Sequence, residues 1–196
     1  MSEPAPVAAP EPDAPASKAG RNLPVAIGAG VFLVALIVAS LAWQKWLFIA
    51  LAVVALWIGV TELANGFAAR NVRITTWPIL VAIPVIGVAA YIHGEALYLG
   101  LFAALVLVIM IWRLTAGTQD YVRDATASVF VAAYIPLMLG FAVLTLRTED
   151  GAWRIVAFIA LTIGSDIGGY AAGVLFGKHP MAPGISPKKS WEGFAG

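Results

Sequence analysis

Long apolar runs separated by short polar stretches make up most of the chain. Each run is close to the ~20 residues that a helix needs to cross a hydrocarbon core of about 30 Å. A backbone inside lipid must satisfy its own hydrogen bonds, so these runs predict helices rather than open strands. The pattern therefore predicts an all-α polytopic membrane protein with about six transmembrane helices, at Leu23–Leu41, Leu47–Ala64, Ile74–Ile92, Ala96–Trp112, Ala127–Leu146 and Trp153–Phe176.

Three prolines interrupt the predicted helices. Pro78 and Pro84 lie in the third run, and Pro136 lies in the fifth. Proline lacks the N–H group that closes a helical turn, so it leaves a carbonyl oxygen without its usual donor. We expect these prolines to kink their helices, and neighbouring helices to cover the freed carbonyls.

Composition supports a membrane protein and removes several kinds of site. The chain is 61% hydrophobic and 12% charged, whereas soluble domains carry about a quarter charged residues. Residues 1–22 are rich in proline, alanine and glutamate and predict a disordered cytoplasmic tail. The absence of cysteine excludes disulfides and thiolate metal sites. The only histidines, His93 and His179, are far apart in sequence, which argues against a histidine metal cluster.

The positions of lysine and arginine predict the orientation. With a cytoplasmic N-terminus, nine of these residues lie inside and three, Lys45, Arg147 and Arg154, lie outside, as the positive-inside rule requires. Residues 23–176 then form a transmembrane helical domain, and residues 177–196 form a basic cytoplasmic segment. We expect a multi-pass protein of the cell (inner) membrane. The loop Arg113–Thr126, which mixes both charges, is interpreted as solvated with local ion pairs.

Asp166 is the clearest candidate for chemistry within a predicted span. It lies roughly 16–20 Å from either end of its run, where a carboxylate costs a few kcal/mol and usually faces a bundle interior or a wet cavity. A structural hydrogen bond to another helix is the alternative. Tyr170 follows one turn later on the same face. Small residues at four-residue spacing allow another backbone to approach and leave space beside Asp166 for a ligand: Ser165, Gly169, Gly173 and Gly177.

A short polar segment near the end of the chain holds two adjacent lysines. Lys188 and Lys189 offer point charges that suit phosphate groups, and Ser186 and Ser190 offer hydroxyl groups beside them. The alternative is a basic patch that attracts anionic lipid headgroups. His179 is close to this segment in sequence and is a weaker candidate for a phosphate contact.

Residues 165–196 closely resemble the phosphatidate cytidylyltransferases, also called CDP-diglyceride synthases. The resemblance rests on two strings, D-x-G-G-Y-x-x-G-x-x-F-G-K-H at 166–179 and A-P-x-I-S-P-K-K-S-W-E-G-F at 182–194. It implies an enzyme that joins CTP to phosphatidic acid and releases pyrophosphate, in a lipid bilayer and with Mg²⁺ as the usual metal. A homodimer is expected, and no nucleic acid partner.

The resemblance also implies roles for individual residues. Lys188 and Lys189 are expected to hold the triphosphate or the lipid phosphate, with Asp166 lining the cavity as a third catalytic residue. Five further residues are expected to bind substrate: Tyr170, Lys178, Ser186, Ser190 and Glu192.

One departure from the family pattern limits these expectations. The family has a longer C-terminal part, which contains the aspartates expected to hold metal, and this sequence stops before it at Gly196. We therefore expect the chain to be inactive alone, with its metal ligands unknown. Two alternatives are CTP-dependent activation of another lipid phosphate, and a non-catalytic transporter or scaffold. A transporter predicts a second charge in mid-span as a partner for Asp166, and none is found.

Overall fold

The computed structural model describes residues 23–182, 184 and 186–196, so the tail predicted at residues 1–22 lies outside the described residues. The chain divides into two compact units, residues 1–36 and 37–196. Helix α1, Leu23–Trp43, crosses this division. Its described side chains in the first unit are mostly exposed, as a helix surrounded by lipid requires.

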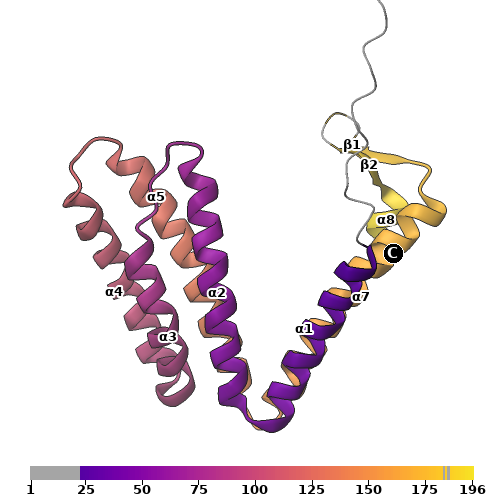
Figure 1. Ribbon diagram of the computed structural model, residues 1–196, viewed down its shortest axis with the longest axis horizontal. Helices are drawn as coiled ribbons and strands as arrows, with labels where there is room; N and C mark the ends of the chain where they lie inside the picture. The colour runs from indigo at the N-terminus through magenta and orange to yellow at the C-terminus, as the bar shows by residue number, and fades with distance from the viewer. Residues whose placement is uncertain (1–22, 183, 185) are drawn as a thin grey trace, which may run out of the picture. The chain divides into compact units, whose positions relative to one another are not determined.

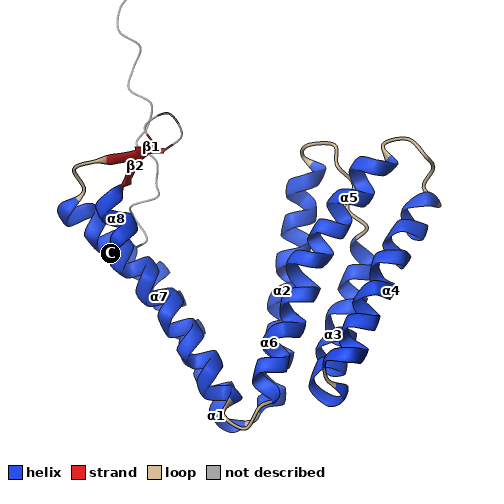
Figure 2. Cartoon of the chain, turned by 180° about the vertical axis from the view of Figure 1, so that it is seen from behind, coloured by secondary structure: helices blue, strands red, loops and turns tan. Residues whose placement is uncertain are grey.

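The second unit is almost entirely helical (Figures 1 and 2). Each predicted run forms a helix, and only the boundaries differ by a few residues. The helices are α2 Lys45–Ala68, α3 Thr76–His93, α4 Glu95–Leu114, α5 Tyr121–Ala132, the π-helical turn η2 Ala133–Leu137, α6 Met138–Arg147 and α7 Gly151–Phe176. Two short strands and a short helix follow, β1 Pro180–Ala182, β2 Ser186–Ser190 and α8 Trp191–Ala195.

Five helical segments of the described chain are long and apolar enough to cross a membrane. They are α2, α3, α4, the continuous segment α5–η2–α6, and α7. Helix α1 adds a shorter apolar stretch, Ile27–Trp43. The prediction of an all-α polytopic membrane protein is therefore confirmed.

The core of the second unit forms around α3, which packs against α2, α4 and α6. Ile79, Ile83 and Ile86 lie on one face of α3 at helical spacing and are almost completely buried. Val60 of α2 and Val143 of α6 are buried in the same cluster. Because lipid tails are as apolar as these side chains, close van der Waals packing stabilises the bundle more than removal from water does.

At Pro84, a neighbouring helix supplies a donor to the freed carbonyl oxygen, as predicted. This residue lies inside α3 and leaves the carbonyl oxygen of Leu80 without a helical donor. The indole Nε1–H of Trp57, on α2, donates to that oxygen at 2.8 Å. Pro136 lies in the π-helical turn η2, where the hydrogen-bond pattern changes locally. Pro78 lies in the first turn of α3, where a missing N–H costs little.

The interpretation of the Arg113–Thr126 loop as solvated is wrong for its central ion pair. Helix α5 begins at Tyr121, six residues before the predicted start, so Asp124 lies in its first turn. The side chains of Arg113 and Asp124 are only 6% and 1% exposed. The guanidinium Nε and Nη2 lie 3.1 and 3.0 Å from Asp124 Oδ2. The local ion pair was predicted, but its burial between helices was not.

This ion pair belongs to a cluster that fastens the α2–α3 loop to α5. The other oxygen of Asp124 accepts the backbone N–H of Arg73 at 3.2 Å. Ser128 accepts the backbone N–H of Thr75 at 2.9 Å. We call these five residues the Arg113–Asp124 cluster. Among the described residues, every buried side-chain nitrogen and oxygen has a hydrogen-bond partner, so the cluster avoids the cost of an unpaired charge.

Candidate functional site

The chain turns back on itself after α7 and forms a small hairpin (Figure 2). Strands β1 and β2 pair antiparallel, with Pro180 opposite Ser190 and Ala182 opposite Ser186, and the register shifts between these pairs. The backbone N–H of Trp191 donates to the carbonyl oxygen of His179 at 3.0 Å. The base of the hairpin therefore lies directly at the end of α7.

Helix α8 packs against the stripe of small residues on α7. A Cβ atom added to Gly169 would lie 2.9 Å from the carbonyl oxygen of Gly193. One added to Gly193 would lie 3.0 Å from the Cα atom of Gly173. At such distances neighbouring atoms must move, so only glycine fits this contact. The prediction that the stripe lets another backbone approach is confirmed, and that backbone belongs to the same chain.

The Glu192 carboxylate joins the two ends of the hairpin. Its Oε1 lies 2.6 Å from Nδ1 of His179. Its Oε2 accepts the backbone N–H groups of Lys178 and His179 at 3.2 and 3.3 Å. The hydrogen bond with the His179 side chain, helped by the backbone donors, lowers the pKa of Glu192 to about 2. We call these contacts the Glu192 clasp.

The residues predicted to bind phosphate lie on β2 or beside it. Ser190 accepts the backbone N–H of Gly193 at 3.2 Å and so caps α8. Its hydroxyl hydrogen can still be donated to a ligand. Ser186 is half-buried in the strand pair, and Lys189 is exposed. Lys188 belongs to β2, but its side chain lies outside the described residues.

Asp166 and Tyr170 lie on α7, and both are exposed. Asp166 is 15 residues after Gly151 and 10 before Phe176, which corresponds to about 22 Å and 15 Å along the helix. The structure thus places a carboxylate well inside an apolar helix without burying it among the described helices. The predicted cavity around Asp166 stays a prediction.

The segment at 177–196 contains six of the eight predicted site residues: Lys178, Ser186, Lys188, Lys189, Ser190 and Glu192. The other two, Asp166 and Tyr170, lie outside it on α7. Between them on α7 lies Gly168, and a Cβ built on Gly168 would lie 2.6 Å from the carbonyl oxygen of Gly196, so this part of α7 contacts the end of the chain. No hydrogen bond joins Asp166 or Tyr170 to the hairpin residues that the structure describes.

The contact between His179 and Glu192 was not predicted from the sequence. The ring and the backbone N–H of His179 both contact Glu192, and a phosphate contact of His179 stays a prediction. A signal was available, because Pro183 and Gly184 together predict a reversal of the chain. A reversal at that point brings residues 178–182 opposite residues 186–192.

The described residues do not form a complete metal site. Over the described part of the chain, no three histidine, aspartate or glutamate side chains come together as a metal-binding group. The donors that the structure describes therefore do not by themselves form a complete Mg²⁺ site.

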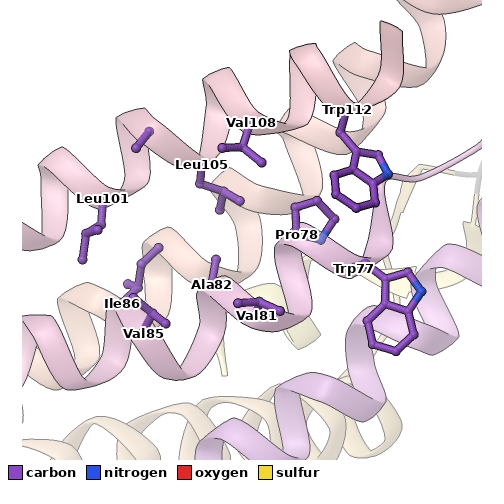
Figure 3. A pocket seen from close by; sticks show the side chains of 11 residues that line it. Trp77, Pro78, Val81, Ala82, Val85, Ile86, Leu101, Leu105, Val108 and Trp112 are labelled. Carbon is purple, nitrogen blue, oxygen red and sulfur yellow. The ribbon is translucent and has the colours of Figure 1, made fainter. Parts of the chain in front are cut away.

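The bundle also carries an apolar groove between α3 and α4 (Figure 3). It has a volume of about 550 Å³. Its lining contains no charged side chain, so it offers nothing to hold a triphosphate or a phosphate group. The groove is lined by Trp77, Pro78, Val81, Ala82, Val85, Ile86, Leu101, Ala104, Leu105, Val108 and Trp112. The hairpin at 177–196 remains the better candidate for phosphate chemistry.

Comparison with known proteins decides the family. The model of the cytidylyltransferase family matches residues 24–196, which includes every described helix and the hairpin almost completely. The chain belongs to the cytidylyltransferase family. The resemblance first drawn from the two strings near the C-terminus is thereby confirmed over most of the chain.

Curated relatives of this cytidylyltransferase carry a more specific name. Phosphatidate cytidylyltransferase of Mycobacterium leprae is 37% identical over 195 residues, covering 91% of this chain and 62% of the relative. The protein of the same name from Mycobacterium tuberculosis H37Rv is 35% identical over 207 residues, covering 99% of this chain and 63% of the relative. That of Pseudomonas aeruginosa is 52% identical over 42 residues, or 21% of this chain and 16% of the relative.

The chain thus spans less than two thirds of the length of these two mycobacterial relatives. No solved structure matches it.

Proposed function

We propose that this cytidylyltransferase transfers the cytidylyl group of CTP to phosphatidic acid, giving CDP-diacylglycerol and pyrophosphate. The observation that carries the proposal is the similarity to relatives named phosphatidate cytidylyltransferase over 91% and 99% of the chain. The proposal also draws on the two strings at 166–179 and 182–194, which contain the hairpin residues.

The reaction forms one bond and breaks one. An oxygen of the phosphatidic acid phosphate attacks the α-phosphorus of CTP, and the bond to the departing pyrophosphate breaks. The main task of a protein in such a transfer is to hold the groups in line and to offset negative charge. Lys188 and Lys189 supply positive charge from β2, and the hydroxyls of Ser186 and Ser190 supply hydrogen bonds. Lys178, at the base of the hairpin, adds a further positive charge.

The membrane orientation belongs to the proposal. One substrate is a lipid and the other is a cytosolic nucleotide, so the hairpin is placed at the cytoplasmic face of the cell membrane. The loops of the second unit support this placement. Arg73 and Arg113 meet in one cluster at one end of the bundle, whereas Lys45 donates to the carbonyl oxygen of Thr148, between α6 and α7. The more basic end is the cytoplasmic one by the positive-inside rule.

Mg²⁺ and a homodimer complete the proposal. Both come from the resemblance to phosphatidate cytidylyltransferases. A divalent cation bound to the triphosphate would offset charge on the oxygens around the reacting phosphorus. Asp166, an exposed carboxylate on α7, would supply at most one ligand to such a cation, or would bind an ordered water.

The direct test uses membranes that contain the product of the complete open reading frame to which these residues belong. CTP labelled at the α-phosphorus, phosphatidic acid and Mg²⁺ are added, and labelled lipid is extracted. We expect CDP-diacylglycerol and an equal amount of pyrophosphate. A parallel assay with an ether-linked lipid phosphate tests the alternative acceptor. If no acceptor yields a CDP-lipid, the enzyme proposal is overturned and a transporter or scaffold is favoured.

Lys188→Ala tests the part assigned to the hairpin. Loss of one charge-assisted phosphate contact, worth about 1.5–3 kcal/mol, should lower kcat/KM about 10- to 100-fold. Insertion into the membrane should be unchanged, as measured by the amount of protein in washed membranes. Arg70→Ala is the matched control, because Arg70 is an exposed basic residue outside the hairpin. Equal activities of the two variants would make the lysines a headgroup patch instead.

A further inference from the structure

We infer that Glu192 is a positioning residue, which holds the hairpin base closed so that Lys188 and Lys189 stay placed for a substrate phosphate. The inference rests on the proposed function and changes the part predicted for Glu192, which was expected to bind substrate. It starts from the Glu192 clasp, in which one carboxylate contacts the residues at the opposite end of the hairpin.

The oxygens of Glu192 are already engaged. Three donors, the ring of His179 and two backbone N–H groups, share the two carboxylate oxygens. An ionised carboxylate offers about four lone-pair sites, so little acceptor capacity is left. Its side chain is also only 26% exposed, against 77% for His179. A group held in this way is better placed to hold the chain than to meet a ligand.

The charge of Glu192 points to the same conclusion. A carboxylate close to a phosphate raises the energy of both groups, because like charges repel. In the clasp, the negative charge faces His179 and the N–H groups that follow the end of α7. Lys188 and Lys189 on β2 are close to Glu192 in sequence. The hairpin nevertheless directs the Glu192 carboxylate toward Lys178 and His179, which precede β1.

The clasp acts on the end of β2 that carries the lysines. Lys189 is followed by Ser190, which caps α8, and by Trp191, which donates its N–H to His179. Packing of α8 on the glycines of α7 holds the same residues from another side. Without the Glu192 carboxylate, the links between residues 178–182 and 186–192 reduce to strand pairing and the Trp191 hydrogen bond. The strand that carries the lysines then gains freedom to move.

The test compares steady-state kinetics of Glu192→Ala, His179→Ala and the double variant in the complete protein. Displaced lysines lose phosphate binding in the ground state and the transition state alike. We therefore expect KM for CTP or for phosphatidic acid to rise about tenfold in Glu192→Ala, with kcat within about threefold of the unaltered protein. His179→Ala should shift the same KM in the same direction by less. The double variant should be no worse than Glu192→Ala, because both changes open one clasp.

Two kinetic results would overturn the inference. A large fall in kcat with both KM values unchanged, in a variant that inserts into membranes in normal amount, would give Glu192 a direct part in the chemistry. Independent, multiplying effects of the two substitutions would show that the residues do not act through one contact. Glu149→Ala is the matched control, since Glu149 is an exposed glutamate outside the hairpin, and its kinetics should not change.

A second measurement separates this inference from the proposed function. Hydrogen exchange at the backbone amides of Lys178 and His179 reports the clasp whether or not the protein makes CDP-diacylglycerol. Exchange in Glu192→Ala should be about tenfold faster than in the unaltered protein, because both amides lose their acceptor. Unchanged exchange would overturn the clasp even in an active enzyme. Faster exchange in an inactive protein would keep the clasp and reject the reaction.

Discussion

Two carboxylates in this protein make nearly the same set of contacts in opposite surroundings. Asp124 accepts a backbone N–H from Arg73 and pairs with the guanidinium of Arg113. Glu192 accepts backbone N–H groups from Lys178 and His179 and pairs with the His179 ring. Asp124 is 1% exposed, whereas Glu192 is 26% exposed.

Because the two carboxylates differ in exposure, the loss of each is expected to have a different effect. A buried ion pair lends little net stability, but removal of one partner leaves the other charge without compensation. The Glu192 pair is partly exposed and is screened by water through His179, which is 77% exposed, so its loss is felt locally. Loss of one partner of the Arg113–Asp124 pair is therefore expected to destabilise the bundle, whereas loss of the Glu192 clasp is expected to loosen only the hairpin. We therefore assign stability of the bundle to the Arg113–Asp124 cluster and positioning of the hairpin to the Glu192 clasp.

The largest effect is expected from Asp124→Asn. The substitution keeps the shape of the side chain and removes its charge, so the buried guanidinium of Arg113 loses its counter-charge. We expect a loss of about 3–5 kcal/mol in the free energy of unfolding. Thermal unfolding in detergent and the yield of folded protein from membranes would measure it.

Asp120→Asn is the matched control for this change. Asp120 pairs with Arg123, but its side chain is 48% exposed, so the same chemical change should cost no more than about 1 kcal/mol. Asparagine also tolerates the left-handed backbone of residue 120, where φ is 57°. Equal stability of the two variants would mean that burial does not distinguish the Arg113–Asp124 cluster from a surface pair.

An intermediate effect is expected from Gly169→Ala, which alters the contact between α7 and α8. The added methyl group would lie 2.9 Å from the carbonyl oxygen of Gly193, so α8 must move away from α7. The cost of such overpacking is typically about 1–3 kcal/mol. We expect faster hydrogen exchange at the Gly193 amide and lower formation of CDP-diacylglycerol, with the bundle intact.

Gly164→Ala tests whether this effect is specific. A Cβ atom at Gly164 meets nothing within 4 Å, and alanine favours a helix over glycine by up to about 1 kcal/mol. The variant should therefore be neutral or slightly more stable, with α8 undisturbed. If both substitutions loosen α8 equally, the packing of glycine on glycine does not hold the hairpin.

The smallest effect is the pH dependence of the Glu192 clasp. The pKa of Glu192 is lowered from 4.5 to about 2, first of all by the hydrogen bond with His179. A carboxyl group with a lowered pKa contributes stability that is fully present above its unfolded value and is lost as pH falls through its folded value. The clasp should therefore persist at pH 4.5 and open toward pH 2.

Carbon-13 NMR of labelled glutamate carboxyl groups can follow this titration. The Glu192 signal is identified as the one that disappears in Glu192→Gln. A midpoint near pH 4.5 would show that Lys178 and His179 do not hold the carboxylate in solution.

Much of the fold follows from the sequence, because lipid leaves a backbone few choices. All six apolar runs form helices, although the third is rich in residues that favour strands in water. The donor supplied by Trp57 to the carbonyl freed by Pro84 follows the same rule. The stripe of small residues on α7 also predicted a close backbone contact, because small side chains let another backbone approach a helix.

The site was less predictable than the fold. The strings at 166–179 and 182–194 identified the family, whereas the roles that they imply for the lysines and for Glu192 stay predictions, and neither string predicted the contact between Glu192 and His179. Neither residue reveals its partner, because the contact depends on how β1 and β2 pair. The polar neighbours of Arg113 and Asp124 in sequence predict a solvated loop, whereas the pair is buried because α5 packs against α4.

The sequence by itself determined the membrane class, the helices and the family, because hydropathy and motif identity are properties of each residue and its near neighbours. Only the tertiary structure decided which charges are buried and which backbone covers the glycines. It also decided that Glu192 faces His179. Those outcomes depend on which distant segments meet, and the energy of a charge or a glycine contact changes more with its partner than with its position in the chain.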